Sequence, residues 1–192
     1  MSNSTQLSEK DIVKDILKGD LSAKKYLYCH YARYLTGVCA RYISDNDDVR
    51  EVLQESFLKI FSSIHLFDYR GQGCLKAWLA RIVVNESLKF LKKEYRFEFL
   101  PLSDENDMAE DETDIEGIPL TALHAMIRDL PVGYRTILNL YVFEEKSHKE
   151  IAALLGIKEN TSASQYHRAK NILAEKIRKY HNLINVSVDY ER

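Results

Sequence analysis

The stretch from Ser103 to Glu116 constrains the fold more than any other part of the chain, because it holds eight acidic side chains and no basic one. Like charges at this density repel one another, and few apolar side chains are available for burial, so the stretch predicts a solvated, flexible linker. The linker divides the 192 residues into two parts. The domains that we expect are a first domain over 1–96, an acidic linker over 97–117, a second domain over 118–181 and a tail over 182–192.

The composition on both sides of the linker favours helices. The chain has only 7 Gly and 3 Pro, too few for an all-β protein with many tight turns, whereas residues that favour helices are abundant. Apolar residues recur at helical spacing, as between Val49 and Phe61. We therefore predict an all-α protein of two small helical domains. The expected helices cover about 8–17 and 22–43, then one that follows the turn at 44–48 and carries Val49 to Phe61, then about 74–95 and 118–128. Three more follow: one starting near Pro131, one capped by Ser147, and a last one over about 160–180.

Bulk properties exclude several classes of protein. Net charge is −2 and the pI is about 6.3, which argues mildly against unaided binding to duplex DNA. The three cysteines form no CxxC pair, so zinc sites and disulfides are not expected. We see no catalytic constellation, no metal site and no cofactor motif, and predict that the chain is not an enzyme. The sequence shows neither a signal peptide nor an apolar membrane span, so we expect a cytoplasmic protein without membrane insertion.

A helix-turn-helix motif is predicted between Ser147 and Lys170. Ala152 is small enough for a close helix crossing, and Gly156 can adopt the left-handed turn between the two helices. Residues 158–181 carry six Lys or Arg against two Glu, which favours DNA binding over a plain helical hairpin with a solvated polar face. The side chains expected to face DNA are Thr161, Ser164, Gln165, His167, Arg168 and Lys170.

Two segments together resemble a known family. EVLQESFLKIF from Glu51 and KAWLARIVVNESLKFLKK from Lys76 resemble region 2 of the sigma-70 family, and residues 130–170 resemble region 4. The order of the two regions, with an acidic linker between them, is similar to that of the extracytoplasmic-function (ECF) sigma factors. The resemblance covers about 8–96 and 118–180, and the tandem is more specific than either motif alone. It implies a sigma factor that directs bacterial core RNA polymerase to promoter DNA.

The resemblance also implies roles for individual residues. One helix would dock on the clamp of the polymerase β′ subunit through Asp48, Glu51, Gln54, Glu55 and Phe57; from charge alone it would be a solvated acidic face. The promoter −10 element would be opened and held by Phe67, Asp68, Arg81, Asn85, Lys89 and Lys92. Region 4 would dock on the β-flap and read the −35 element, and an anti-sigma factor would cover both domains. Trp78 shares an apolar stripe with Leu79 and is expected in the core.

Departures from the family pattern limit what is carried over. Lys89 stands where the family usually has Asp or Asn, so the preferred −10 bases are open. Ser162, Ala163 and Gln165 replace a usual Val and usual basic residues, which predicts weaker direct binding to duplex DNA. Two alternatives stay open: an autonomous helix-turn-helix regulator that does not act with polymerase, and an adaptor that sequesters another factor.

Overall fold

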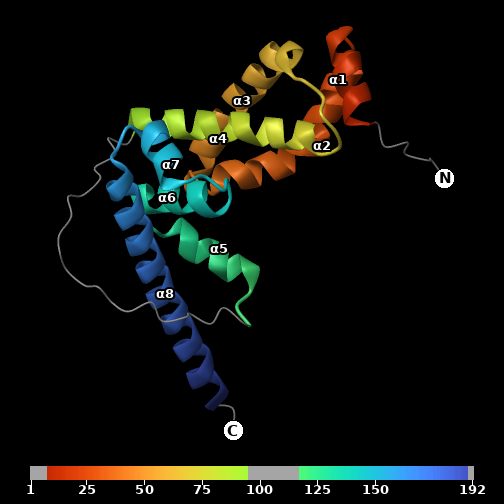
Figure 1. Ribbon diagram of the computed structural model, residues 1–192. Coiled ribbons are helices and arrows are strands. Elements are labelled where there is room, and N and C mark those ends of the chain that lie inside the picture. Colours follow the sequence, from red (N-terminus) through yellow and green to blue (C-terminus); the bar gives the residue numbers. More distant parts are fainter. Residues whose placement is uncertain (1–7, 95–116, 190–192) are drawn as a thin grey trace. The chain divides into compact units, whose positions relative to one another are not determined.

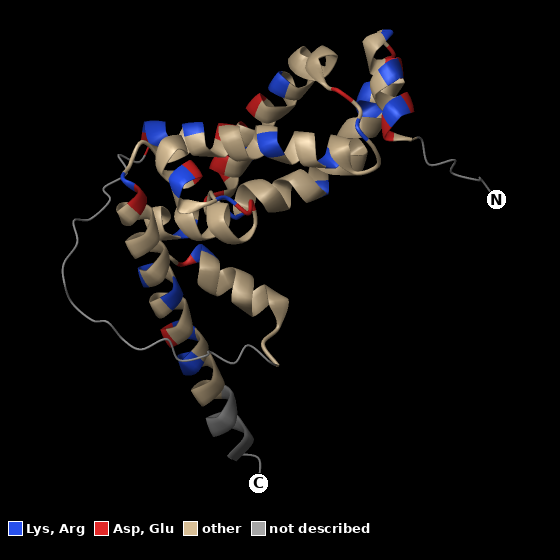
Figure 2. Ribbon diagram, in the orientation of Figure 1, with Lys and Arg blue, Asp and Glu red and all other residues tan. Residues whose placement is uncertain are grey.

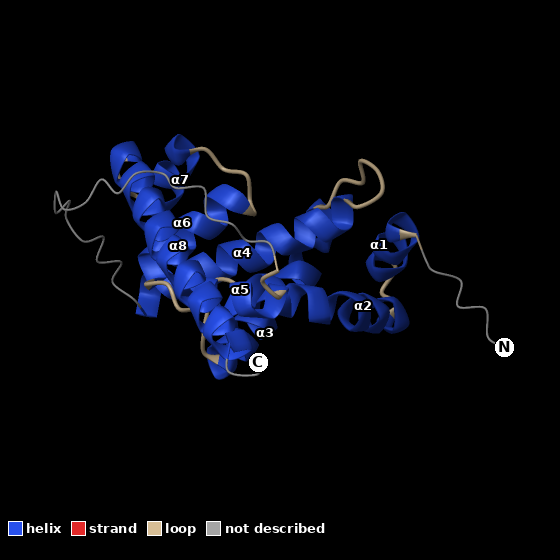
Figure 3. Ribbon diagram, turned by 90° about the horizontal axis from the view of Figure 1, so that it is seen from below, coloured by secondary structure: helices blue, strands red, loops and turns tan. Residues whose placement is uncertain are grey.

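The computed structural model describes residues 8–94 and 117–189, with side chains to Leu183, and these residues form eight α-helices and one 3-10 helix without a strand (Figures 1 and 3). The chain divides into two compact units, Met1–Arg96 and Phe97–Arg192. All-helical structure in two units agrees with the predicted fold class. The predicted acidic linker lies outside the described residues, apart from Gly117.

The first unit is a bundle in which α1 (Glu9–Leu17), α2 (Leu21–Ala40), α3 (Asn46–Ser63) and α4 (Cys74–Glu94) pack together, with the 3-10 helix η1 (Ile64–Leu66) after α3. Short polar side chains start the first three helices: Ser8, Asp20 and Asp45 each accept a hydrogen bond from a backbone N–H in the first turn. Each of the four helices buries apolar side chains, and the fully buried ones include Ile12, Leu27, Leu35, Ile60, Leu75, Leu79 and Leu91.

The second unit contains α5 (Leu120–Arg128), α6 (Val132–Val142), α7 (His148–Leu155) and the long α8 (Glu159–Asp189). Helix α8 contacts α5, α6 and α7, so it is the element around which the unit is built. One cluster of its core joins Ile127, Leu130, Leu138 and Ala169. The sequence places the end of the last helix near Tyr180, but α8 continues to Asp189, because no Gly or Pro after Tyr180 stops it.

The predicted helix-turn-helix is formed by α7 and α8. Ser147 and Glu150 make a capping box in which each side chain binds the other residue's backbone N–H, which fixes the start of α7. Gly156 ends α7 in the left-handed conformation with φ 74°, the turn predicted for it. Ala152 and Ile151 are buried between the helices. No helix among the described residues is long and apolar enough to cross a membrane.

Candidate nucleic-acid and partner interfaces

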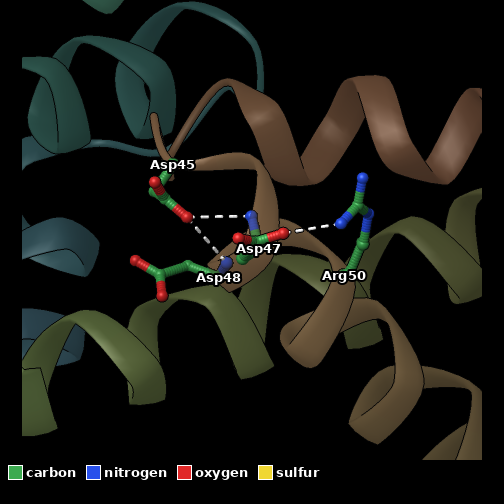
Figure 4. A network of polar contacts seen from close by, with 4 residues as sticks. All are labelled: Asp45, Asp47, Asp48 and Arg50. Carbon is green, nitrogen blue, oxygen red and sulfur yellow. Dashed lines mark hydrogen bonds and ion pairs between the residues drawn. The ribbon is translucent and has the colours of Figure 1, made fainter.

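Acidic side chains crowd the first turn of α3. The carboxylate of Asp45 accepts hydrogen bonds from the backbone N–H groups of Asp47 at 2.8 Å and Asp48 at 3.1 Å (Figure 4). Asp47 is paired with Arg50 at 2.6 Å, and this ion pair is exposed. Partial removal from water raises the pKa of Asp48, and the carboxylates of Asp45, Glu51, Glu94 and Asp47 raise it further. The cluster thus holds negative charges that repel one another and that a basic partner would stabilise.

A groove of about 900 Å³ lies beside this cluster, between α2 and α3. Its lining is mostly apolar: Tyr28, Ala32, Thr36, Asn46, Val49, Arg50, Leu53, Gln54, Phe57, Leu58 and Phe61. Tyr28 is 51% exposed and Leu58 64% exposed, whereas Phe57 is only 7% exposed and its ring packs 4.7 Å from that of Tyr28. Of the residues expected to bind polymerase, Gln54 and Phe57 therefore line the groove, while Glu51 and Glu55 are exposed on the same helix.

Four polar residues expected to contact the −10 element form one exposed stripe on α4. Arg81, Asn85, Lys89 and Lys92 are separated by four, four and three residues, which is helical spacing for a single face, and all four are exposed. Lysines and arginines recur along α4 in Figure 2. Lys89 pairs with Glu86 at 3.3 Å, and both belong to the helix itself. The stripe could therefore bind the backbone of a DNA strand through its positive charges and hydrogen-bond a base through the Asn85 amide.

The loop before α4 carries the other two residues expected at the −10 element. Phe67 is half-buried, and its ring meets the Trp78 ring edge-on at 5.5 Å. Asp68 is exposed and pairs with Arg70 at 3.0 Å. Trp78 was expected in the core but is half-buried, while Leu79 beside it is fully buried. The only Trp of the chain therefore lies against this loop.

Glu9 of α1 forms hydrogen bonds with the backbone where the same loop joins α4. Its carboxylate accepts hydrogen bonds from the backbone N–H groups of Gly73 at 2.9 Å, Leu75 at 3.2 Å and Lys76 at 3.4 Å. The hydroxyl of Tyr31 donates to the same carboxylate at 3.3 Å. Burial raises the pKa of Tyr31 to about 12, and the adjacent Glu9 charge adds to the shift. Sequence reasoning missed Glu9, because a cap supplied from 64 residues away leaves no local signal.

The start of α8 places most of the residues expected at the −35 element at intermediate exposure. Thr161, Ser164, His167, Arg168 and Lys170 are all half-buried, with His167 accepting a hydrogen bond from Asn171 Nδ2 at 3.2 Å in the tautomer that leaves Nε2 unprotonated. Lysines and arginines also recur along α8 (Figure 2).

Gln165 departs from the expectation. Its side chain is 2% exposed and lies on the helix face that carries buried Ser162 and Ala169. A side chain packed into the unit in this way cannot reach a base edge, so Gln165 is not a DNA-facing residue in this fold. Its polar side chain suggested a contact with DNA, but it is buried inside the second unit.

His148 links three helices of the second unit. Its ring stacks on that of Tyr141 at 4.7 Å and lies 5.7 Å from that of Tyr166. Its Nδ1 is 3.0 Å from the hydroxyl oxygen of buried Ser162 on α8. His148 therefore takes part in the packing of the helix-turn-helix. Among the described residues, no group of His, Cys, Asp and Glu could hold a metal ion.

Comparison with known proteins finds two family models, one matching chiefly in the first unit and one within the second. The model of Sigma-70 region 2 matches residues 27–97, and the model of Sigma-70, region 4 matches residues 120–173. The chain is 30% identical over 189 residues to the ECF RNA polymerase sigma-E factor of Haemophilus influenzae, an alignment that covers 90% of this chain and 96% of that protein. It is also 25% identical over 189 residues to the RNA polymerase sigma-H factor of Pseudomonas aeruginosa, covering 88% of this chain and 93% of that protein.

Two solved structures are similar to the chain. CnrH in complex with the cytosolic domain of CnrY matches with a TM-score of 0.48 and 20% identity, over 89% of this chain and 97% of that one. The sigma factor RpoE in complex with the anti-sigma factor NepR from Bartonella quintana matches with a TM-score of 0.49 and 21% identity, over 80% of this chain and 96% of that one.

Proposed function

The chain belongs to the ECF group of the sigma-70 family, the RNA polymerase sigma factors that initiate transcription, and from this premise we propose how its surfaces divide the work. Members of this family are not enzymes; they act by binding the polymerase and the promoter. The family decides against an autonomous regulator or an adaptor. Family membership does not say which residues contact the polymerase and which contact the promoter. We assign these contacts from the three surfaces described above.

The acidic turn of α3 and its groove form the proposed docking surface for the β′ clamp of core RNA polymerase. Charge repulsion at Asp48, together with exposed Glu51 and Glu55, favours a basic partner. The neighbouring apolar groove, with Gln54 on its lining and Phe57 as its floor, would bury apolar side chains of that partner. An apolar groove with charged side chains beside it is typical of a protein interface.

The loop at Phe67 and Asp68 and the α4 stripe form the proposed surface for the −10 element. Proteins hold single-stranded DNA with a basic track along the backbone and with aromatic or shaped pockets for unstacked bases. Arg81, Lys89 and Lys92 supply the track, and Asn85 lies among them as a hydrogen-bonding group. The half-exposed Phe67 and Trp78 rings lie on the loop side of the stripe. We assign strand opening and base capture to this combination.

The first turns of α8 form the proposed surface for the −35 duplex. In a helix-turn-helix the second helix enters the major groove and its first turns meet the base edges. The proposed contacts are Thr161, Ser164, His167, Arg168 and Lys170, without Gln165. The second unit would also dock on the β-flap, and the segment 97–117, of which only Gly117 is among the described residues, would connect the two units across the polymerase. This shared binding accounts for a net charge of only −2 in a DNA-reading protein.

An anti-sigma factor is a further proposed partner. In the free protein the groove leaves Tyr28 and Leu58 open to water, and exposed apolar side chains grouped in this way mark interaction sites. A partner that covered the groove would hide the surface proposed for polymerase and keep the factor inactive. The protein would act in the cytoplasm, where bacterial RNA polymerase transcribes DNA.

The apolar groove between α2 and α3, beside the acidic first turn of α3, is the observation that carries the residue assignments, and core polymerase binding tests them. The full-length chain is mixed with bacterial core RNA polymerase, and their association is measured by fluorescence anisotropy of a labelled chain. We expect binding that is abolished by Leu58→Glu, which places a charge on the rim of the groove, and kept by Leu183→Glu, which changes an equally exposed leucine of α8. Equal binding by both variants would remove the groove from the proposal.

A further inference from the structure

We propose that Glu9 of α1 is a positioning residue for the −10 loop, residues 67–73, so that the first described helix governs how the chain captures the opened strand. The role of the loop in DNA binding rests on the proposed function, but the hydrogen bonds between Glu9 and the start of α4 are present in the fold itself. Glu9 would not contact DNA itself. It would act by holding the backbone of the loop that positions Phe67 and Asp68.

The Glu9 carboxylate accepts hydrogen bonds from most of the backbone N–H groups at the start of α4 that need a partner. The first four N–H groups of a helix have no partner within the helix. Here Cys74 N–H donates to the Gly71 carbonyl at 3.3 Å, and the N–H groups of Gly73, Leu75 and Lys76 donate to the Glu9 carboxylate. One carboxylate from another helix therefore takes over the role of the cap that the local sequence does not supply.

Local residues are poorly suited to that role. The residues before α4 are Gly71, Gln72 and Gly73, and both glycines have positive φ, 136° and 88°. Glycine offers no side-chain oxygen to a helix start, and its freedom lets the loop take many paths. The same glycines that allow the loop to turn thus leave it dependent on an anchor from outside.

Helix α1 also holds the other end of the loop. It contacts η1, the 3-10 helix that leads into Phe67, and Ile64 of η1 is buried. The Tyr31 hydroxyl, from buried Tyr31 on α2, binds the Glu9 carboxylate and fixes its direction. The loop is therefore fastened at both ends to α1, and loss of the carboxylate would release the end that joins the basic stripe of α4.

The single tryptophan makes the inference measurable without DNA or polymerase. Because Trp78 lies against Phe67 of the loop, quenching of its fluorescence by acrylamide reports whether the loop covers it. We expect Glu9→Ala to raise the quenching constant and Glu9→Gln, which keeps an acceptor oxygen, to fall between it and the wild type. Asp15→Ala is the matched control, because it removes one negative charge from the same helix at a carboxylate paired with Lys18. Equal quenching in Glu9→Ala, Asp15→Ala and the wild type would overturn the proposal.

A second measurement separates positioning from general damage. The full-length variants are assembled with core RNA polymerase and titrated with fluorescein-labelled single-stranded DNA from a promoter selected in vitro with the wild-type complex. For Glu9→Ala we expect affinity for the strand to fall roughly fivefold, the scale of one lost helix cap, with polymerase affinity unchanged. Equal loss of both affinities, or normal strand binding despite altered Trp78 quenching, would contradict the proposal. A wild-type complex that ignores every single strand would instead overturn the proposed function, and the quenching measurement would still test the contact.

Discussion

The cores of the two units differ in what holds them together. Among the described residues of the first unit, the buried polar side chains are Ser56 and Ser87, and each hydroxyl donates to a carbonyl one turn earlier in its own helix, at 2.7 Å and 2.8 Å. In the described part of the second unit there are five buried polar side chains, on α6 and α8: Arg135, Thr136, Asn139, Ser162 and Gln165. Arg135 donates to the carbonyl of Arg128, across the turn between α5 and α6. In the first core apolar contacts dominate, with a buried hydrogen bond from Ser87 on α4 to the Cys39 sulfur on α2. The second core is smaller and holds more buried polar side chains, among them Arg135, which joins α6 to the end of α5.

The difference bears on what each unit does. Apolar packing is tolerant of direction and gives most of the stability of a fold, whereas buried hydrogen bonds are costly to leave unmade and so favour one arrangement of the helices. The first unit presents broad surfaces, a groove and a stripe, that depend on a stable bundle. The second must hold the start of α8 at one angle to α7. A small core reinforced by hydrogen bonds suits that requirement.

The strongest test of the comparison removes apolar volume from the first unit. Leu79→Ala, at a fully buried position, should lower the free energy of unfolding of that unit by about 3 kcal/mol through the cavity it leaves. Urea unfolding followed by Trp78 fluorescence reports the first unit alone, and circular dichroism reports both. Leu58→Ala, at an exposed position, is the control and should have little effect. A single transition that shifts as a whole in both signals would show that the two units do not unfold independently.

Alkaline pH should weaken the first unit selectively. Burial raises the pKa of the Cys39 thiol from 9.0 to about 11, while its hydrogen bond with Ser87 acts in the opposite direction. Because the unfolded chain loses this proton first, stability is complete below pH 9 and falls as the pH rises to 11, by at most about 3 kcal/mol. All three cysteines lie in the first unit. Urea titrations at both pH values should show a smaller decline in Cys39→Ala; an unchanged decline would assign it to other groups, among them Tyr31.

Arg135→Ala probes the polar core of the second unit. Removal of the guanidinium leaves the Arg128 carbonyl without this donor in a partly buried place, and we expect a loss of about 2 kcal/mol in the stability of that unit. The loss should appear in the circular dichroism transition and not in Trp78 fluorescence. Arg178→Ala, on the exposed side of α8, is the matched control. If both variants unfold like the wild type, the buried arginine is not part of what stabilises the second unit.

Arg168→Ala tests the division of labour between the units. Loss of a base or phosphate contact should weaken binding of the polymerase complex to a −35 duplex by about 1 to 2 kcal/mol. Association with core polymerase should stay the same, because that contact is assigned chiefly to the first unit. Electrophoretic mobility shifts with the assembled complex measure the first quantity and anisotropy the second. Equal loss of both would contradict the assignment.

The reverse pattern is expected for the double variant Gln54→Ala with Glu55→Ala. These changes remove polar contacts at the edge of the groove without touching the core, so polymerase association should weaken by about 1 kcal/mol. Once a saturating concentration of the variant has formed the complex, its affinity for a −35 duplex should equal that of the wild type. Weaker duplex binding at saturation would mean that the first unit influences the second.

Local signals in the sequence account for much of this fold. The Ser147 cap and the Gly156 turn lie where the sequence places them, because each depends on residues within a few positions of it. Features that depend on distant partners could not be predicted. Gln165 looks like any exposed polar residue until α8 is packed in its unit, and Glu9 looks like an ordinary first-turn carboxylate until Gly73 lies beside it.

The cap supplied by Glu9 also has a consequence for how the chain folds. Its bonds to Gly73, Leu75 and Lys76 join residues at least 64 positions apart, whereas α7 and the start of α8 pair within a short stretch. Contacts between residues far apart in the sequence form slowly, because the chain must lose the conformational entropy of a long loop before the contact can stabilise it. During synthesis α1 must therefore wait for the start of α4 to leave the ribosome. We expect the first unit to be the slower of the two to reach its native form, although it is translated first.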